Sequence, residues 1–149
     1  QALDPSGKIL TIPSKKINFK YRGTDLKEDM IFLSATFKGF KKEKKLIEKD
    51  IRIFKEKKEK AQPSRIKTGG STFKNPIDQS TKKVWQLIEE SVPLNTKFGD
   101  AVISQKHCNF FVNKKNATFE NMKKLISFVK KKVKDKTGIN INLEIVVVE

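Results

Sequence analysis

The sequence predicts an α+β fold in which a mostly antiparallel sheet is backed by helices. Two stretches, 42–61 and 118–138, repeat apolar residues at helical spacing. Short runs rich in β-branched and aromatic residues lie before, between and after them. The 149 residues, 36% of them apolar, are enough for one ordinary domain or two small ones.

The N-terminal portion of the chain holds two predicted strands. We expect them at 8–12, after turn-forming residues, and at 31–37, with a polar and aromatic loop at 19–23 between them. The helix predicted over 42–61 carries an apolar stripe among many Lys and Glu residues: Leu46, Ile47, Ile51, Ile53 and Phe54. A Gln-Pro-Ser sequence ends this helix, so we divide the chain into predicted domains 1–61 and 62–149.

The C-terminal portion alternates helices and strands. A helix is predicted over 80–90, and strands over 101–104 and 109–112 on either side of a turn. The last helix has Thr118 as its expected N-cap, Gly138 just past its end, and a buried stripe: Met122, Leu125, Ile126, Val129 and Val133. The β-prone residues 139–148 end in a continuous apolar run that predicts a strand buried on both faces.

The net charge of +16 raises the question of a nucleic-acid partner, because Lys-rich faces neutralise phosphates regardless of sequence. The excess is nearly all Lys, whereas base-edge recognition favours Arg. The Lys clusters fall on helical segments interleaved with Glu and Asp, which is typical of a solvated helix face. We therefore expect no nucleic-acid partner, and keep a Lys-rich, non-catalytic nucleic-acid-binding module as the alternative.

Other classes of site are disfavoured. Cys108 is the only cysteine, which excludes an internal disulfide and a Cys-based metal site and is consistent with a reducing compartment. His107, the only histidine, has no neighbouring ligand spacing, so we expect no metal. No apolar run approaches the roughly 20 residues that span a bilayer, and we expect no membrane partner.

Two segments carry a family resemblance. Residues 70–76 read Gly-Ser-Thr-Phe-Lys-Asn-Pro, and residues 104–113 read Ser-Gln-Lys-His-Cys-Asn-Phe-Phe-Val-Asn. They resemble the Gly-Ser-x-Phe-Lys-Asn-Pro and Ser-x-Lys-His-x-Asn-Phe motifs of the UDP-N-acetylmuramate dehydrogenase family (MurB), in the same order and spacing. The resemblance covers essentially the whole chain, which corresponds to the C-terminal half of such an enzyme.

The resemblance implies a cytoplasmic oxidoreductase of peptidoglycan synthesis, and hence of cell-wall biogenesis, cell shape and cell division. It implies reduction of UDP-N-acetylglucosamine enolpyruvate to UDP-N-acetylmuramate by FAD, which NADPH reduces first. Residues 1–61 would finish the FAD-binding region and 62–149 would form the substrate domain. The chain has neither a Gly-x-Gly-x-x-Gly nor a phosphate-loop motif, so we expect FAD contacts mostly upstream of Gln1 and an isolated chain that is inactive.

The roles of individual residues follow from the first motif. From its surroundings alone, Ser71 is a turn serine after two glycines, with a hydroxyl that bonds its own backbone. The resemblance implies instead that Ser71 is the general acid that protonates the substrate carbanion. It also implies that Lys74 and Asn75 bind substrate.

Tyr21 and Arg22 are, from the residues alone, a surface pair with cation–π contact. Residues 19–22 resemble the family's Phe-x-Tyr-Arg segment, with Thr24 where the family usually has Ser. This implies that Tyr21 binds substrate and that Arg22 is catalytic, stabilising the enolate-like carboxylate with a fork of donors that a Lys lacks.

Glu144 is a carboxylate within an apolar run, so it either shares a solvent-facing polar edge with its neighbours or is held for function. Residues 138–145 resemble the family's closing Gly-Val-x-Leu-Glu-x-Glu-Val, which implies that Glu144 is catalytic. The second motif implies that His107 and Asn109 bind substrate, although His107 alternatively orients its turn. Shared chemistry requires Arg22, Ser71 and Glu144 to face one cleft.

Overall fold

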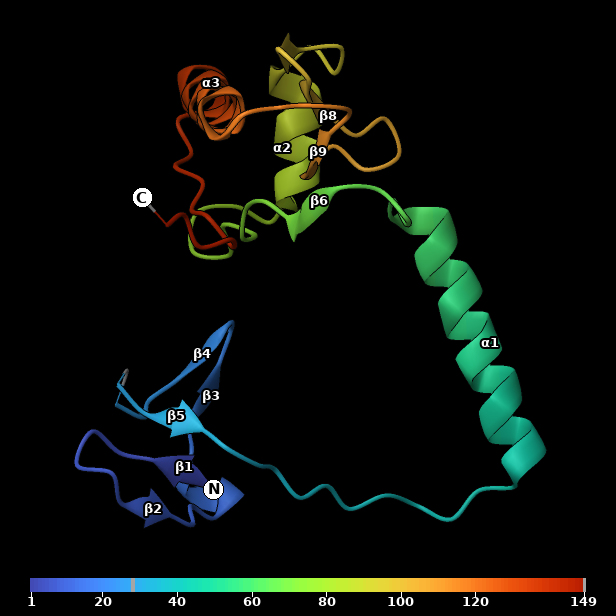
Figure 1. Cartoon of the computed structure of the whole chain (residues 1–149), viewed down its shortest axis with the longest axis vertical. Helices are drawn as coiled ribbons and strands as arrows, with labels where there is room; N and C mark the ends of the chain where they lie inside the picture. Colours follow the sequence, from blue (N-terminus) through green and yellow to red (C-terminus); the bar gives the residue numbers. More distant parts are fainter. Residues whose placement is uncertain (28, 149) are drawn as a thin grey trace. The chain divides into compact units, whose positions relative to one another are not determined.

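The computed structural model describes residues 1–27 and 29–148 (Figure 1). The chain forms two compact units, one of residues 1–43 and one that begins at Lys44. The helix predicted over 42–61 therefore belongs to the second unit by its contacts. The division into a cofactor-binding region, residues 1–61, and a substrate-binding region, residues 62–149, stays a prediction.

A small sheet organises the first unit. Its central strand β1 (Ala2–Leu3) pairs antiparallel with β2 (Ile9–Leu10) on one side and with β5 (Ile31–Phe32) on the other. Both β-prone runs of the sequence thus contain a strand, but each strand is shorter than predicted. Because β1 has only two residues, the ladder on each side ends after two positions.

A hairpin replaces the loop predicted over 19–23. β3 (Phe19–Lys20) pairs with β4 (Gly23–Thr24), and a short 3-10 helix, η1 (Ser14–Lys16), precedes it. Tyr21 and Arg22 are the two residues at the tip of this hairpin. The hairpin was not predicted because neither tip residue is a glycine, asparagine or aspartate, the usual signals for such a turn.

The second unit begins with α1 (Lys44–Ala61), which confirms the first predicted helix. None of its residues is buried, and four of its apolar side chains are 41–66% exposed: Leu46, Ile47, Ile51 and Phe54. Good helix-forming residues and an i,i+4 ion pair between Lys44 and Glu48 at 3.8 Å favour its helical form.

Four antiparallel strands form the sheet of the second unit, in the order β6-β9-β8-β7. They are β6 (Thr68–Ser71), β7 (Lys97–Phe98), β8 (Ala101–Ile103) and β9 (Phe110–Asn113). β8 and β9 lie within one residue of the predicted strands. Connections of two residues between β7 and β8, and of six between β8 and β9, are short enough for neighbouring strands to run antiparallel.

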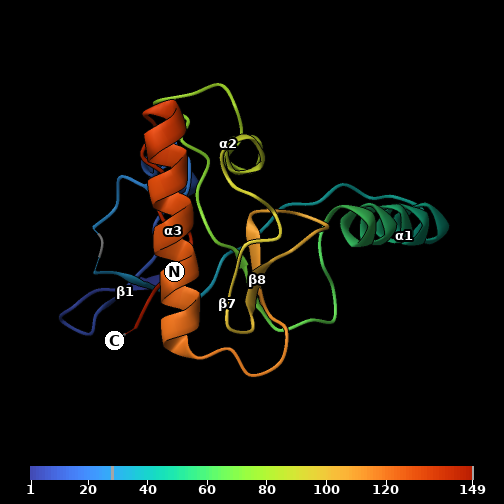
Figure 2. The same ribbon diagram turned by 90° about the horizontal axis from the view of Figure 1, so that it is seen from above.

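Two helices back this sheet, which confirms the α+β prediction. α2 (Val84–Ser91) and α3 (Phe119–Thr137) pack against each other, and α3 also lies against β7 and β8 (Figure 2). Thr118 caps α3 as predicted: its hydroxyl oxygen accepts from the Asn121 N–H at 3.2 Å. Gly138 ends the helix with a φ of 74°, a left-handed conformation that favours glycine.

The core of the second unit lies between the sheet and these helices. Its largest fully buried side chains come from both helices, the β6–α2 segment and the residues after α3: Phe73, Leu87, Ile88, Leu125, Val129, Val133 and Ile141. The rings of Phe73 and Phe111 meet edge to face, 5.8 Å apart. This core fixes the segment that carries the first motif.

The strand predicted over 139–148 is wrong. Apart from a single bridge between Phe73 and Leu143, these residues form no strand, and Val146 and Val148 are 87% and 81% exposed. A β-prone sequence becomes a strand only where a neighbouring backbone continues the ladder. Among the residues that the structure describes, the pairing stops beside Phe73, so the Val residues lack that partner.

Candidate functional site

Ser71 is the last residue of β6 and pairs with Phe110 in β9. Gly70 precedes it with a φ of 87°, a left-handed conformation that favours glycine. Beyond Ser71 the chain continues beside the second motif, where the Thr72 N–H donates to the Asn109 carbonyl oxygen at 2.8 Å. The two motifs are therefore adjacent in space.

Glu144 lies beside the first motif. The Glu144 N–H donates to the Thr72 carbonyl oxygen at 2.9 Å, and the Lys74 N–H donates to the Asn142 carbonyl oxygen at 2.8 Å. These two bonds enclose the Phe73–Leu143 bridge. The main chain of the segment that holds Ser71 and Lys74 thus lies beside the main chain of Glu144, about 70 positions away in the sequence.

The side chain of Asn109 bonds to the main chain of the first motif. Its Nδ2 donates to the Phe73 carbonyl oxygen at 2.9 Å, and its Oδ1 accepts from the Phe73 N–H at 3.0 Å. Asn109 is only 4% exposed. Substrate binding by this residue stays a prediction, and its contacts in the structure hold the segment that follows Ser71.

Asn75 also bonds to the protein itself. Its Oδ1 accepts from the Val84 N–H at 3.0 Å, at the first residue of α2. The Gln86 side chain accepts from the Lys83 N–H at 2.9 Å in the same turn. These bonds supply partners for amide groups that a helix start leaves unpaired, so Asn75 connects the first motif to α2.

His107 is half-buried on the turn between β8 and β9. Its Nδ1 accepts from the Asn109 N–H at 3.3 Å, and its ring meets that of Phe110 edge to face at 5.0 Å. Burial lowers the pKa of His107 below its usual 6.5, since the imidazolium form loses hydration. The neutral ring with an accepting Nδ1 carries its proton on Nε2, which makes Nε2 a hydrogen-bond donor.

Tyr21 and Arg22 lie on the first unit, at the tip of the β3–β4 hairpin. The Arg22 guanidinium carbon is 5.4 Å from the centre of the Tyr21 ring, which confirms the predicted cation–π contact. Arg22 has a φ of 57°, an uncommon conformation for a residue with a side chain. That Arg22 faces one cleft with Ser71 and Glu144 stays a prediction.

Ser104 and Lys106 have structural roles that were not predicted from the sequence. The Ser104 hydroxyl accepts from the Lys106 N–H at 3.2 Å and from the His107 N–H at 3.4 Å. The Lys106 ammonium donates to the carbonyl oxygen of Glu59 in α1. The role of Ser104 could have been predicted from its place at the start of the predicted turn, since serine hydroxyls commonly bond the main chain two or three residues ahead.

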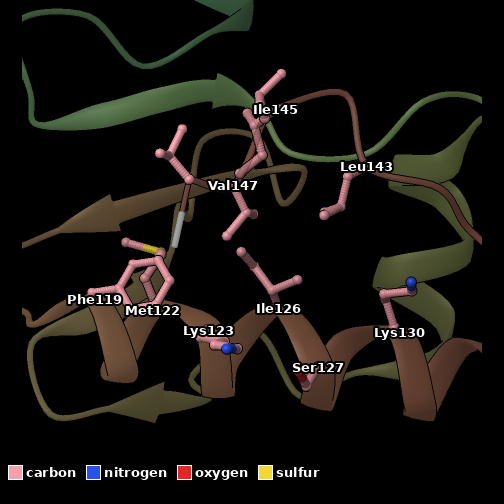
Figure 3. Close-up of a pocket in the computed structure, with 11 residues that line it drawn as sticks. Phe119, Met122, Lys123, Ile126, Ser127, Lys130, Leu143, Ile145 and Val147 are labelled. Carbon is pink, nitrogen blue, oxygen red and sulfur yellow. The ribbon is translucent and has the colours of Figure 1, made fainter.

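Several hollows lie on the described part of the second unit. One of about 370 Å³ borders His107 and is lined also by Trp85, Glu89 and Lys106. A larger one of about 550 Å³ lies between α3 and the C-terminal residues, and its walls are mostly apolar (Figure 3). In Figure 3, Ile126 and Met122 of α3 and Leu143 and Val147 of the C-terminal segment face this hollow.

In residues 1–27 and 29–148, no three His, Cys, Asp or Glu side chains gather in a way that would hold a metal ion. Among the same residues, no helix is both long enough and apolar enough to cross a bilayer.

Comparison with known proteins gives consistent matches. Residues 62–148 match the family model for the C-terminal domain of UDP-N-acetylenolpyruvoylglucosamine reductase. A reductase of that name from Pelagibacter ubique is 63% identical over 145 residues, and one from Rickettsia typhi is 39% identical over 145 residues. Each match covers 97% of this chain and 48% of the relative, so the chain spans about half the length of the curated relatives it matches.

A solved structure gives the same result. The chain is similar to UDP-N-acetylenolpyruvylglucosamine reductase (MurB) from Thermus caldophilus, with a TM-score of 0.73 and 26% identity. The similarity covers 96% of this chain and 49% of that protein.

Proposed function

Because this chain belongs to the UDP-N-acetylenolpyruvoylglucosamine reductase family, we propose that it supplies the substrate-handling half of such an enzyme. The reaction is the reduction of UDP-N-acetylglucosamine enolpyruvate to UDP-N-acetylmuramate in peptidoglycan synthesis, with FAD and NADPH as cofactors. We assign it to the cytoplasm, as the resemblance implies. Nucleic acid and membranes are not partners in this proposal.

One observation carries the proposal: the main-chain bond between Glu144 and Thr72. It places the main chain of Glu144 beside Thr72, the residue that follows Ser71 in the first motif. The proposal requires the Glu144 carboxylate and the Ser71 hydroxyl to face one cleft, where Ser71 supplies the proton that follows hydride addition to the enolpyruvyl group. Glu144 and Thr72 are far apart in the sequence, so a local turn does not explain why their main chains lie side by side.

In the proposed reaction, Ser71 donates the proton to the substrate carbon that becomes carbanionic after hydride addition. The charge that develops on the adjacent carboxylate is stabilised by Arg22, whose planar guanidinium presents parallel N–H donors. Glu144 stabilises the same enolate together with Arg22. Tyr21, Lys74 and His107 bind the UDP-sugar, with the Nε2–H of His107 as a donor.

Asn75 and Asn109 have a different role in this proposal. Each uses its side-chain amide to hold the Ser71–Asn75 segment, against α2 and through Phe73 respectively. They fix the position of Ser71, and substrate binding by either residue stays a prediction. Precise placement of a proton donor contributes to the rate because reacting groups must meet within hydrogen-bond distance.

FAD, when bound by such an enzyme, supplies the hydride. The cofactor's pyrophosphate is often held in proteins by the free N–H groups of a helix start. At α2 the Val84 and Lys83 amides already donate to Asn75 and Gln86, and at α3 the Asn121 amide donates to Thr118. We therefore assign no flavin contact to either helix and derive no step of the reaction through the cofactor here.

The proposal is tested with a chimera in which this chain replaces the matched region of the Pelagibacter ubique reductase. NADPH-dependent loss of the enolpyruvyl sugar, with saturation in that sugar, is the expected result. If the chimera binds flavin but never consumes the sugar, the proposal is wrong. Tight, salt-sensitive binding of random duplex DNA by the 149-residue chain would favour the nucleic-acid alternative instead.

A further inference from the structure

The turn of residues 104–109 is tied to three separate elements. The Lys106 ammonium donates to the Glu59 carbonyl oxygen in α1, and the Cys108 thiol donates to the Trp85 carbonyl oxygen in α2 at 3.0 Å. The Asn109 amide bonds to the main chain of Phe73 at both ends. His107 lies in the middle of this turn, so three contacts together determine where its imidazole points.

The Lys106 contact uses a group that α1 leaves without a helical partner. The last four carbonyl oxygens of a helix have no N–H from within the helix, and the Glu59 carbonyl is one of them in a helix that ends at Ala61. The neighbouring Lys58 carbonyl already accepts from the Gln62 N–H at 2.9 Å. A cation at this end also interacts favourably with the helix dipole.

The same contact closes a ring of elements. From Glu59 the chain runs through residues 62–67 into β6, which pairs with β9, and β9 follows the turn that carries Lys106. Apart from the Lys106–Glu59 bond, the end of α1 is connected to these elements by the chain itself, and Ala61 lines the small hollow beside His107. The bond therefore ties the turn to α1, in addition to its contacts with α2 and Phe73.

We propose that Lys106 is a positioning residue for substrate binding, which rests on the proposed function. By binding the end of α1 it holds the 104–109 turn so that the Nε2–H of His107 is directed at the UDP-sugar. Lys106 itself does not contact the substrate. Its loss should weaken substrate binding more than it slows the chemical step.

The chain offers a matched control. Lys136 in α3 makes the same kind of contact at another helix end, because its ammonium donates to the Glu90 carbonyl oxygen at the end of α2. Removing either lysine deletes one positive charge and one cation at a helix C-terminus. Only Lys106 is in the turn that holds His107.

The experiment compares Lys106→Met, Lys106→Arg and Lys136→Met in two settings. In the 149-residue chain, NMR follows the imidazole signals of His107 and the exchange rate of the Gln62 amide. In the chimera with the Pelagibacter ubique reductase, KM for the enolpyruvyl sugar and kcat are measured. Lys106→Met should shift the His107 signals, and should raise the Gln62 exchange rate and KM by roughly 3-fold each, as expected for one exposed cation at a helix end.

In the same experiment, kcat should stay nearly constant and Lys106→Arg should recover most of the loss. Lys136→Met should leave the His107 signals and KM at wild-type values. The proposal fails if Lys106→Met leaves the His107 signals unchanged, or if Lys136→Met shifts KM equally, which would indicate a general effect of charge. An inactive wild-type chimera would count against the proposed function, while the NMR comparison would still decide the role of Lys106.

Discussion

The side chain of Asn109 and the main chain of Phe73 form two hydrogen bonds with each other, one in each direction, at 2.9 and 3.0 Å. This pair joins the two motifs on which the family resemblance depends. It explains in physical terms why an asparagine occupies this position, because only an amide side chain offers a donor and an acceptor side by side. Ser71 lies two residues before Phe73, so the pair also fixes the proposed proton donor.

Asn109→Ala should therefore destabilise the second unit strongly. Two buried main-chain groups of Phe73 lose their partners, and the expected loss is about 2–4 kcal/mol in the free energy of unfolding. Urea unfolding followed by Trp85 fluorescence reports on this unit, since Trp85 is the only tryptophan and lies on α2. The exposed Asn95→Ala serves as the control, and equal midpoints for the two variants would contradict this reading of Asn109.

Ser71→Ala should separate the two half-reactions of the proposed enzyme. In the chimera, NADPH should reduce the flavin at a nearly normal rate, because no proton from Ser71 is needed in that step. Reoxidation by the enolpyruvyl sugar should slow by roughly 10²-fold or more, as expected for loss of a positioned proton donor. Ser71→Cys, which keeps a transferable proton, should retain more activity than the alanine variant. Equal reoxidation rates for wild type and Ser71→Ala in stopped flow would leave Ser71 as a strand residue with no part in proton transfer.

Replacing Arg22 should affect the stability of the hairpin and the activity of the chimera in opposite directions. Its φ of 57° is costly for a residue with a side chain, by about 1 kcal/mol, so Arg22→Gly should leave the β3–β4 hairpin at least as stable as in the wild type. Amide exchange at Gly23 and Thr24 measures this. Activity of the chimera should nevertheless fall sharply in Arg22→Gly and also in Arg22→Lys, which keeps the charge but lacks the paired donors. Full activity of the lysine variant would show that the fork of donors is not used.

The state of His107 should be visible in the pH dependence of stability. Burial lowers the pKa of His107 in the folded chain below the usual 6.5, so the unfolded chain takes up a proton more readily than the folded one. This contribution is present above about pH 6.5 and is lost as the pH falls through the lower folded pKa. His107→Gln should flatten this region of the stability profile, measured by urea unfolding from pH 7.5 to 5. An NMR titration midpoint for His107 at or above 6.5 would contradict the prediction.

The sequence by itself determined the local elements of this protein and its family. The ends of α3 follow from a threonine that caps its first turn and a glycine that accepts a positive φ, both of which act within a few residues. The 3.6-residue spacing of apolar side chains likewise located α1 and α3. The two motifs led to the family that the comparisons show.

Only the tertiary structure decided which backbones lie side by side. The β-prone end of the chain stays outside any strand because one bridge to Phe73 is all the pairing that the described residues give it. Glu144 is adjacent to Thr72, and Asn75 and Asn109 bond to main-chain groups of other segments. These contacts join parts of the chain that are far apart in the sequence, so local preferences do not determine them. Local preference depends on each residue and its near neighbours, whereas a hydrogen-bond partner far along the chain is chosen by the packing of the whole unit.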